Sequence, residues 1–424
     1  MGSLQKKVKS GLLIPARFVF DHSSFLKYHV VRAANVYKAG KYKKEYARKY
    51  RTDPKLILFV SYWGKQYSCN PRALFEELLR DPRYREYKKV WAFEEPEGYG
   101  WLAGCPRTKV VRYRSRDFYR YCAKAGIWIA NCRMPDEVIP KKDQVYVQAW
   151  HGTPLKKLGF DIGRFKGRTY EQKEHEYQYR YDAGRITWFL SPSDFYREKI
   201  TSAFALRSIG KENCFLEGGY PRNDFLFRYS DKEAREIREK LGIPDNKRVI
   251  LYTPTWREDD HQGYRYKLAV HFEKWRECLG EDTVILYRSH YMVANYIDLS
   301  RFSGFVYNVS DYDDIRDLYV ISDLLVTDYS SVFFDYANLH RPILFYMYDH
   351  DHYREEMRGF YIDEKELPGP IVQTEEELLK LLLQYDGSGY EEIYEAFNRK
   401  FNPYQDGQGS AVVWQRLLED GQGY

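Results

Sequence analysis

The sequence contains few cysteines, and their spacing excludes the sites in which cysteines act together. Six cysteines are spread over 424 residues without a single C-x-x-C pair. Zinc sites and redox-active dithiols need such close spacing, and small disulfide-stabilised domains need a higher cysteine density. We therefore interpret the cysteines as reduced core residues of a cytoplasmic protein.

Long apolar segments are missing as well. No apolar run approaches the ~20 residues that a membrane-spanning helix requires. Near the N-terminus, the short apolar stretch at residues 12–14 is interrupted by Pro15, which does not fit the apolar core of a signal peptide. The sequence thus predicts a cytoplasmic location, and any membrane contact is expected to be peripheral.

A strong net charge is the third feature that the sequence lacks. The formal net charge is only +6, and it is unevenly distributed. Residues 1–52 contain thirteen Lys or Arg against two acids, Asp21 and Glu45, so the rest of the chain is slightly acidic. We therefore expect neither a broad basic surface nor a nucleic acid as partner.

The basic segment at residues 1–52 also carries apolar patterns. A helix predicted over residues 22–38 has these residues on one face: Leu26, Val30, Ala33 and Tyr37. Residues 41–51 then alternate Lys and Arg with three tyrosines: Tyr42, Tyr46 and Tyr50. Basic and aromatic residues in this arrangement suit an anionic membrane surface, and they equally suit a solvated helix that packs on the domain through its tyrosines. Both interpretations remain open.

The rest of the chain alternates short apolar runs of strand length with helical patterns. One such series falls within residues 53–229 and a second within residues 248–385. A charged helix predicted in the linker at residues 230–247 starts at Ser230 and stops at Gly242. Residues 386–424 are helical again and are expected to pack back across the domains. The pattern predicts an α/β protein of the GT-B class, with two Rossmann-like domains and a central cleft.

The stretch at residues 324–339 combines a strand, a turn and a helix start. An apolar run ends at Thr327-Asp328, and Ser330-Ser331 stand where a helix is predicted to begin. Free N–H groups at such a helix start favour an anion, and the two hydroxyls can add hydrogen bonds. Serine is also a preferred cap of any helix, so a capping role alone is the alternative.

Four more polar segments are predicted at strand ends: His151–Pro154, Tyr220–Asp224, Thr253–Arg257 and Arg288–His290. In a parallel sheet such ends border one crevice, where they would gather a base, several cations and an anion-binding turn. Each segment alone is weak evidence for a site, because a histidine there can be an ordinary polar residue, and Arg257 or Arg288 can simply pair with an acid. Together they indicate a transferase that acts on a phosphorylated donor.

In their order, these segments resemble the CDP-glycerol:poly(glycerophosphate) glycerophosphotransferase family, whose enzymes synthesise teichoic acid backbones. The matching pieces are Ser61–Lys65 with Ser68–Pro71, Gln148–Lys156, Gly219–Asp224, Leu251–Arg257 and Thr327–Tyr336. The resemblance implies a GT-B fold, a peripheral position on the inner face of the membrane, and no bound metal or other cofactor. It also implies transfer of a polyol phosphate from a CDP-linked donor to a hydroxyl, with release of CMP.

The resemblance further implies a role for particular residues. His151 is expected to be the general base, because a hydroxyl is a poor nucleophile and a His pKa lies near neutral pH. The expected donor-binding residues are Thr253, Arg257, Arg288, His290, Asp328, Ser330, Ser331 and Asp335. For Asp335, the alternative interpretation is an ordinary solvated acid without a role in binding. The expected acceptor-side residues are Arg222, Asn223 and Asp224.

CDP-glycerol and CDP-ribitol both remain possible donors. The expected acceptor is an undecaprenyl-diphosphate-linked disaccharide or its glycerophosphate-extended form, and the number of units added is open. Two other functions also remain: a GT-B glycosyltransferase that uses a nucleotide sugar, and a catalytically silent scaffold at the membrane surface. The acidic clusters Asp311–Asp314 and Glu258–Asp260 are interpreted as a helix cap and a polar loop, not as metal ligands.

Overall fold

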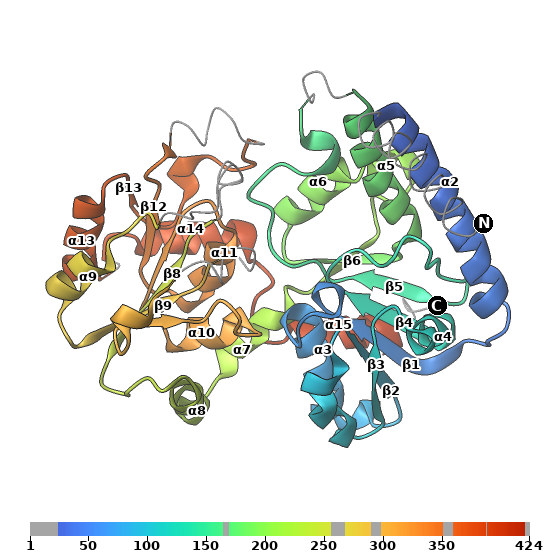
Figure 1. Ribbon diagram of the computed structural model, residues 1–424, viewed down its shortest axis with the longest axis horizontal. Coiled ribbons are helices and arrows are strands. Elements are labelled where there is room, and N and C mark those ends of the chain that lie inside the picture. Colours follow the sequence, from blue (N-terminus) through green and yellow to red (C-terminus); the bar gives the residue numbers. More distant parts are fainter. Residues whose placement is uncertain are drawn as a thin grey trace, which may run out of the picture.

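The computed structural model describes residues 24–163, 169–255, 268–289, 298–350, 359–386 and 388–419. These residues form two domains that lie side by side, each around a parallel sheet (Figure 1). The GT-B prediction is confirmed. Arg257 and His290, two predicted donor-binding residues, lie outside the described residues.

The N-terminal domain is built on a sheet in which seven described strands run parallel in the order β3-β2-β1-β4-β5-β6-β7. The strands are β1 (Asp53–Val60), β2 (Lys88–Phe93), β3 (Thr108–Arg112), β4 (Ala125–Ala130), β5 (Val145–Gln148), β6 (Trp188–Ser191) and β7 (Phe215–Glu217). Ile57 and Phe59 of β1 enter one apolar core, whereas Leu58 and Val60 enter another. Because both faces of the sheet are covered, its central strands are apolar throughout.

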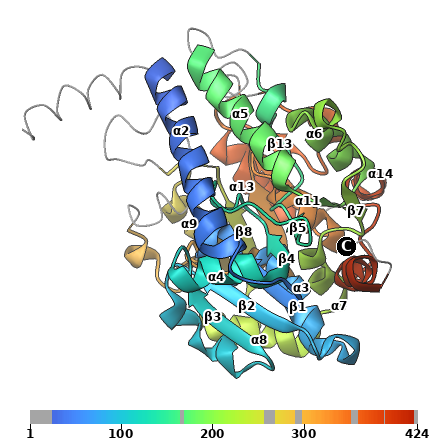
Figure 2. The same ribbon diagram turned by 90° about the vertical axis from the view of Figure 1, so that its right-hand side faces the viewer.

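The main helices of this domain are α2 (Ser24–Tyr42), α3 (Cys69–Arg80), α4 (Arg116–Lys124), α5 (Thr169–Arg185) and α6 (Asp194–Ala203). Helix α2 lies along α5 at the outer edge of the domain (Figures 1 and 2). The tyrosines that follow it pack inward: Tyr42 is only 3% exposed and stacks on Tyr46, which in turn contacts Tyr119. The packing interpretation is therefore correct for this tyrosine stripe.

The C-terminal domain has a second parallel sheet in the order β10-β9-β8-β11-β12-β13. Its strands are β8 (Arg248–Thr253), β9 (Thr283–Tyr287), β10 (Val306–Asn308), β11 (Leu324–Thr327), β12 (Ile343–Tyr346) and β13 (Ile371–Val372), and its described helices include α9 (Phe272–Leu279), α10 (Ile315–Ile321), α11 (Val332–Tyr336) and α13 (Glu375–Gln384). The strand order reverses between β8 and β11. In such sheets the crevice at this reversal is where ligands bind.

The chain crosses between the domains twice. It leaves the first domain through α7 (Asp224–Arg228) and α8 (Asp231–Leu241), and returns after α14 (Glu391–Phe401) to form α15 (Gly409–Trp414) against α3. Helix α8 begins at Ser230, which exchanges hydrogen bonds with Glu233, and ends at Gly242 with a φ of +69°. Both ends agree with the sequence prediction.

A network of charged side chains joins α3 of the first domain to the start of α10 in the second. Glu76 accepts hydrogen bonds from Arg72 at 2.8 Å and from Arg316 at 2.8 Å. Arg72 also lies 3.4 Å from Asp314 and from Asp317. Burial by itself would raise the pKa of Glu76, but Arg316 and Arg72 more than offset this and lower the pKa to about 2. The network thus stabilises the closed arrangement of the domains.

We expect Glu76→Gln to reduce the free energy of unfolding, measured by urea denaturation at pH 7, by about 1–3 kcal/mol, because two charge-assisted hydrogen bonds are weakened. Since the pKa is lower in the folded state, this stabilisation is present above the ordinary Glu pKa and is lost as pH falls from about 4.5 toward 2. The variant and the native chain should therefore converge in acid. Glu86→Gln is the control, because its pair with Lys55 is exposed to water and should contribute little to stability. Equal losses in the two variants would contradict the role of the network.

Candidate active site between the two domains

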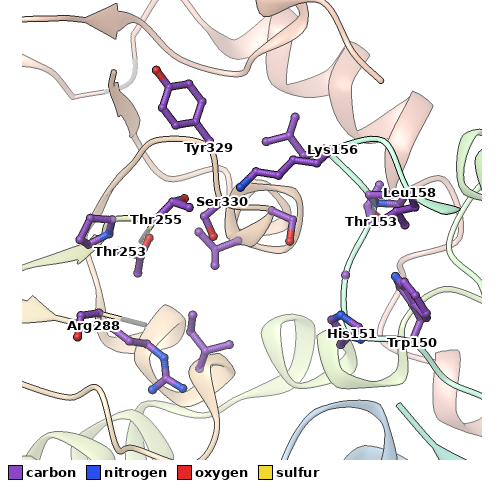
Figure 3. Close-up of a pocket in the computed structure, with 18 residues that line it drawn as sticks. Trp150, His151, Thr153, Lys156, Leu158, Thr253, Thr255, Arg288, Tyr329 and Ser330 are labelled. Carbon is purple, nitrogen blue, oxygen red and sulfur yellow. The ribbon is translucent and has the colours of Figure 1, made fainter. Parts of the chain in front are cut away.

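A cavity of about 600 Å³ lies between the domains. From the N-terminal domain, residues 150–156 and Leu158 line it, and from the C-terminal domain, residues at or after the ends of β8, β9 and β11 line it (Figure 3). A second cavity of about 530 Å³ adjoins it, and both are lined by His151, Arg288 and Ser331. The cleft therefore has room for more than one substrate around His151.

His151 is placed by a sharp turn that follows β5. Trp150, the residue before it, has a φ of +49°, which is unfavourable for a residue other than glycine. Neighbouring side chains hold this turn: Asn70 donates to the carbonyl groups of Ala149 and Trp150, and Gln148 accepts from the Trp150 N–H. A strained backbone that is fixed from several sides is common at functional sites.

The ring of His151 is oriented and kept neutral by its surroundings. Its Nδ1 lies 2.9 Å from the carbonyl oxygen of Asn131, which fits a tautomer with the proton on Nδ1 and a free lone pair on Nε2. The side chain is exposed to the cleft, yet protein atoms of both domains replace much of its hydration. This desolvation lowers the pKa of His151, the Asn131 carbonyl partly opposes it, and the positive charge of Arg222 lowers it further. A neutral imidazole with a free lone pair can accept a proton.

Gly152 allows the His151 turn to approach the other domain closely. A Cβ atom at this position would lie 3.0 Å from Oγ of Ser331 and 3.7 Å from Nη2 of Arg222. Such a distance is shorter than an ordinary van der Waals contact. The absence of a side chain therefore brings the histidine turn and the Ser330-Ser331 turn together.

Ser330 lies across the cavity from His151 (Figure 3), and Ser331, from the same turn, lines both cavities together with His151. Helix α11 begins after them at Val332, and the Ser331 side chain forms no capping hydrogen bond. The simple capping alternative is therefore not supported. The α-helix is also shorter than predicted, because a 3-10 turn, Ala337–Leu339, continues it. An anion here would be bound by hydroxyl and backbone N–H groups of the turn, with little contribution from a helix dipole.

Thr253 lines the cavity, whereas Asp328 lies behind it. The Thr253 hydroxyl is 3.1 Å from that of Thr327. The Asp328 carboxylate is buried and accepts hydrogen bonds from Thr255 and from the Tyr329 N–H. Asp328 thus ties together the turns after β8 and β11, and its described contacts are structural.

Two cations border the cavity. Arg288 donates through Nη1 to the carbonyl oxygens of Val309 and Tyr312, at 3.0 and 2.7 Å, and no carboxylate among the described residues pairs with it. Lys156 extends toward Ser330 (Figure 3), and its backbone forms a β-bridge with Phe360 of the other domain. Sequence reasoning did not assign Lys156 a role, although its position directly after the His151–Pro154 segment offered a signal.

Asp335 pairs with two of the predicted acceptor-side residues. Its carboxylate lies 2.5 Å from Arg222 and accepts from the side-chain amide of Asn223 at 2.9 Å. All three side chains are buried, and Asp335 is 3% exposed, so the alternative of a solvated acid is wrong. Asp335 also lines the second cavity, so its predicted contact with the donor stays a prediction.

Asp224 lies away from the cavity and ties the two crossings of the chain together. Its carboxylate accepts from the backbone N–H groups of Gly409 and Ser410, at 2.9 and 2.7 Å, at the start of α15. It is buried and is absent from the residues that line either cavity of the described structure. The structure therefore corrects the acceptor-side prediction for Asp224: the residue is a helix cap at the domain connection.

The acidic cluster at residues 311–314 also has structural partners. Asp314 caps α10 by accepting from the Arg316 N–H, as the sequence indicated. Within the described ranges, no three His, Cys, Asp or Glu side chains are grouped as a metal site would require. Glu258–Asp260 lie outside those ranges. A reaction without metal stays a prediction.

Known proteins resemble this chain over almost its entire length. The model of a family described as CDP-Glycerol:Poly(glycerophosphate) glycerophosphotransferase matches residues 42–419. A teichoic acid poly(glycerol phosphate) polymerase of Bacillus spizizenii is 38% identical over 371 residues, which cover 86% of this chain and 92% of that protein. A teichoic acid glycerol-phosphate transferase of Staphylococcus aureus is 39% identical over 372 residues, which cover 86% and 93%.

A solved structure is similar as well. A variant of the wall teichoic acid polymerase TagF, soaked with CDPG, matches with a TM-score of 0.81 and 32% sequence identity, covering 94% of this chain and 97% of that one. Sequence and structure therefore agree on the resemblance drawn from the strand-end segments. The chain belongs to the CDP-glycerol:poly(glycerophosphate) glycerophosphotransferase family.

Proposed function

We propose that this chain transfers glycerol phosphate from CDP-glycerol to a hydroxyl of a lipid-linked acceptor and releases CMP. The observation that carries the proposal is the arrangement of the cleft, with a neutral His151 from one domain and Ser330, Ser331 and Arg288 from the other. Membership of the glycerophosphotransferase family and the glycerol phosphate named for both relatives support CDP-glycerol over CDP-ribitol as the donor.

His151 would remove the proton from the acceptor hydroxyl as its oxygen attacks the phosphorus that carries glycerol. The bond from that phosphorus to the bridging oxygen then breaks, and CMP leaves with this oxygen. CMP is already a stable anion, so the reaction does not require a strong general acid. The negative charge on the transferred group would be offset by Arg288 and Lys156 and by hydrogen bonds from the serine turn.

A GT-B glycosyltransferase remains the second candidate, because a histidine base and a phosphate-binding turn serve both reactions. Incubation of the purified chain with CDP-glycerol, CDP-ribitol or a nucleotide sugar, together with a lipid-linked glycerol phosphate acceptor, distinguishes these activities. We expect release of CMP chiefly from CDP-glycerol. Product length on the same acceptor then tells whether one unit or many are added. No CMP release from any donor would favour the silent scaffold.

For His151→Ala we expect turnover to fall by ~10²–10⁴-fold, because a general base is lost, while the dissociation constant for CDP-glycerol changes little. The lowered pKa places the acid limb of the native rate profile below the ordinary His value of ~6.5. Activity should fall as pH drops through that limb, because His151 becomes protonated. The limb should disappear in the variant.

The matched control is His340→Asn, because His340 is exposed, lines neither of the two cavities, and has a φ of +51° that Asn tolerates. It should keep both the rate and the pH profile. A His151→Ala enzyme with near-native turnover would show that another group takes the proton.

The double variant Ser330→Ala/Ser331→Ala tests the donor side. Two hydrogen bonds to a charged diphosphate would be lost, so we expect CDP-glycerol to bind ~10–100-fold more weakly in calorimetry. Because the Ser331 hydroxyl does not cap α11, the melting temperature should hardly change. Ser303→Ala, at an exposed serine, is the control. Unchanged affinity with unchanged melting would exclude a role for these hydroxyls in donor binding.

We also propose that α2 binds an anionic membrane surface on the cytoplasmic side. No helix in the described ranges is both long and apolar enough to cross a membrane. Helix α2 instead presents an outward apolar stripe: Val30 is 44% exposed, Val36 70% and Tyr37 74%. Lys38 and Lys41 adjoin this stripe. Of the predicted face, Val30, Ala33 and Tyr37 are exposed, and the side chain of Leu26 lies outside what the structure describes. Exposed apolar residues with basic neighbours suit an interfacial helix.

The triple variant Val30→Ser/Val36→Ser/Tyr37→Ser should bind less to vesicles that contain anionic lipid, because apolar contact area is removed. Flotation of the native chain should also weaken with added salt, since each basic residue near the surface contributes ~1 kcal/mol. Phe227→Ser is the control, at a residue 44% exposed on α7. If the triple variant floats as well as the native chain, α2 is not the membrane-binding element.

A further inference from the structure

Arg222 is an arginine that the fold has buried beside the catalytic turn. It lies in the 3-10 turn Pro221–Asn223, is 5% exposed, and lines the second cavity together with His151. Its Nη2 is 3.7 Å from the position that a Cβ of Gly152 would occupy, so its charge stands next to the residue after His151. Burial opposes this charge, and the neighbouring Asp335 more than offsets it, so the pKa of Arg222 is raised.

The other domain determines where this charge stands. Nη2 of Arg222 is 2.5 Å from Asp335 of α11, in the C-terminal domain, and Asn223 donates to the second carboxylate oxygen. Nη1 contacts only the sulfur of Cys69 at 3.2 Å, and Nε has no hydrogen-bond partner among the described residues. A buried arginine with a purely structural role normally has its donors satisfied. The guanidinium also lies over the Tyr220 ring, 4.8 Å from its centroid, but its one carboxylate partner among the described residues, Asp335, belongs to the opposite domain.

The other polar groups around His151 come from several elements. The other titratable groups that line the two cavities with it are Tyr62 and Lys65 from the turn after β1, Cys69 from α3, Cys132 from the turn after β4, Lys156, Arg288, Asp313, Asp314, Tyr319, Tyr329 and Asp335. Asp313 is hydrogen-bonded to Tyr99, and Asp314 to the Cys69 N–H and Arg72. The positive charge of Arg222, which lines the second cavity with His151, disfavours the imidazolium form and lowers the pKa of His151.

We propose that Arg222 is a positioning residue of the transfer site, held by Asp335 of the opposite domain so that its positive charge stands beside His151 when the domains are closed. The inference rests on the proposed function, in which His151 is the base. It adds a connection between domain closure and the protonation of that base. If the domains separate, Asp335 moves away from Arg222, and the fixed charge beside the histidine is no longer held in place.

The test is a pH titration of the histidine ring signals by NMR, in the full chain labelled with ¹³C-histidine. The His151 signal is assigned from its loss in His151→Ala. In Arg222→Gln the His151 pKa should rise by ~1 pH unit, because a nearby positive charge is removed and Asp335 remains. Arg222→Lys should keep most of the native value. The control Arg228→Gln should not change it, because Arg228 pairs with Glu77 away from the cleft.

Arg222→Gln leaves a buried carboxylate without its partner and can prevent folding. The double variant Arg222→Gln/Asp335→Asn avoids this, since both charges are removed, and it should also raise the His151 pKa, by less than the single variant. In enzyme assays, the acid limb of CMP release should move to higher pH in the same variants. A merely structural arginine would lower stability without moving the titration.

An unchanged His151 titration in folded Arg222→Gln, or in the double variant, would overturn the proposal. The NMR titration does not depend on turnover, so the two hypotheses can fail separately. A native chain that releases no CMP from CDP-glycerol contradicts the proposed function. A native chain that is active, with an acid limb that depends on His151 but not on Arg222, contradicts this inference alone.

Discussion

The constraint on which the structure depends is that parallel strands point all their carboxyl ends to one edge of a sheet. Two such sheets, placed edge toward edge, bring short polar turns from distant parts of the chain into one cleft. His151 follows β5 of one sheet, and Ser330-Ser331 follow β11 of the other. The apolar strands supply rigidity, and the turns between strands and helices supply the chemistry. Catalysis across the cleft then requires the two domains to be held at a fixed distance.

Charged residues at the domain contact provide that fixed distance. The Glu76 network lies between α3 and α10, and the pair of Arg222 with Asp335 lies next to His151. Buried ion pairs often contribute little net stability, because both partners lose hydration, but they strongly specify one geometry. In the proposed reaction, which aligns a base with a phosphorus atom, defined geometry matters more than added stability.

Local sequence patterns predicted much of this arrangement. The two ends of α8 could be predicted because Ser230 and Gly242 are local signals, a helix cap and a helix stop. The strand ends could be predicted because the apolar runs stop there. The pairing of Asp335 could not be predicted in the same way. Its partner Arg222 is 113 positions away, so the pair exists only after both domains have folded and met. The tyrosine stripe at Tyr42 was ambiguous for a similar reason, since sequence does not show which surface covers it.

Asp224 has a mechanical consequence. The segment that leaves the first domain and the segment that returns to it are fastened to each other, because this carboxylate binds the backbone at the start of α15. Two connections fastened at one place act as a hinge near that place. Opening would therefore widen the cleft most at the side far from the connection, and each closure would return the same atoms to the same opposing positions.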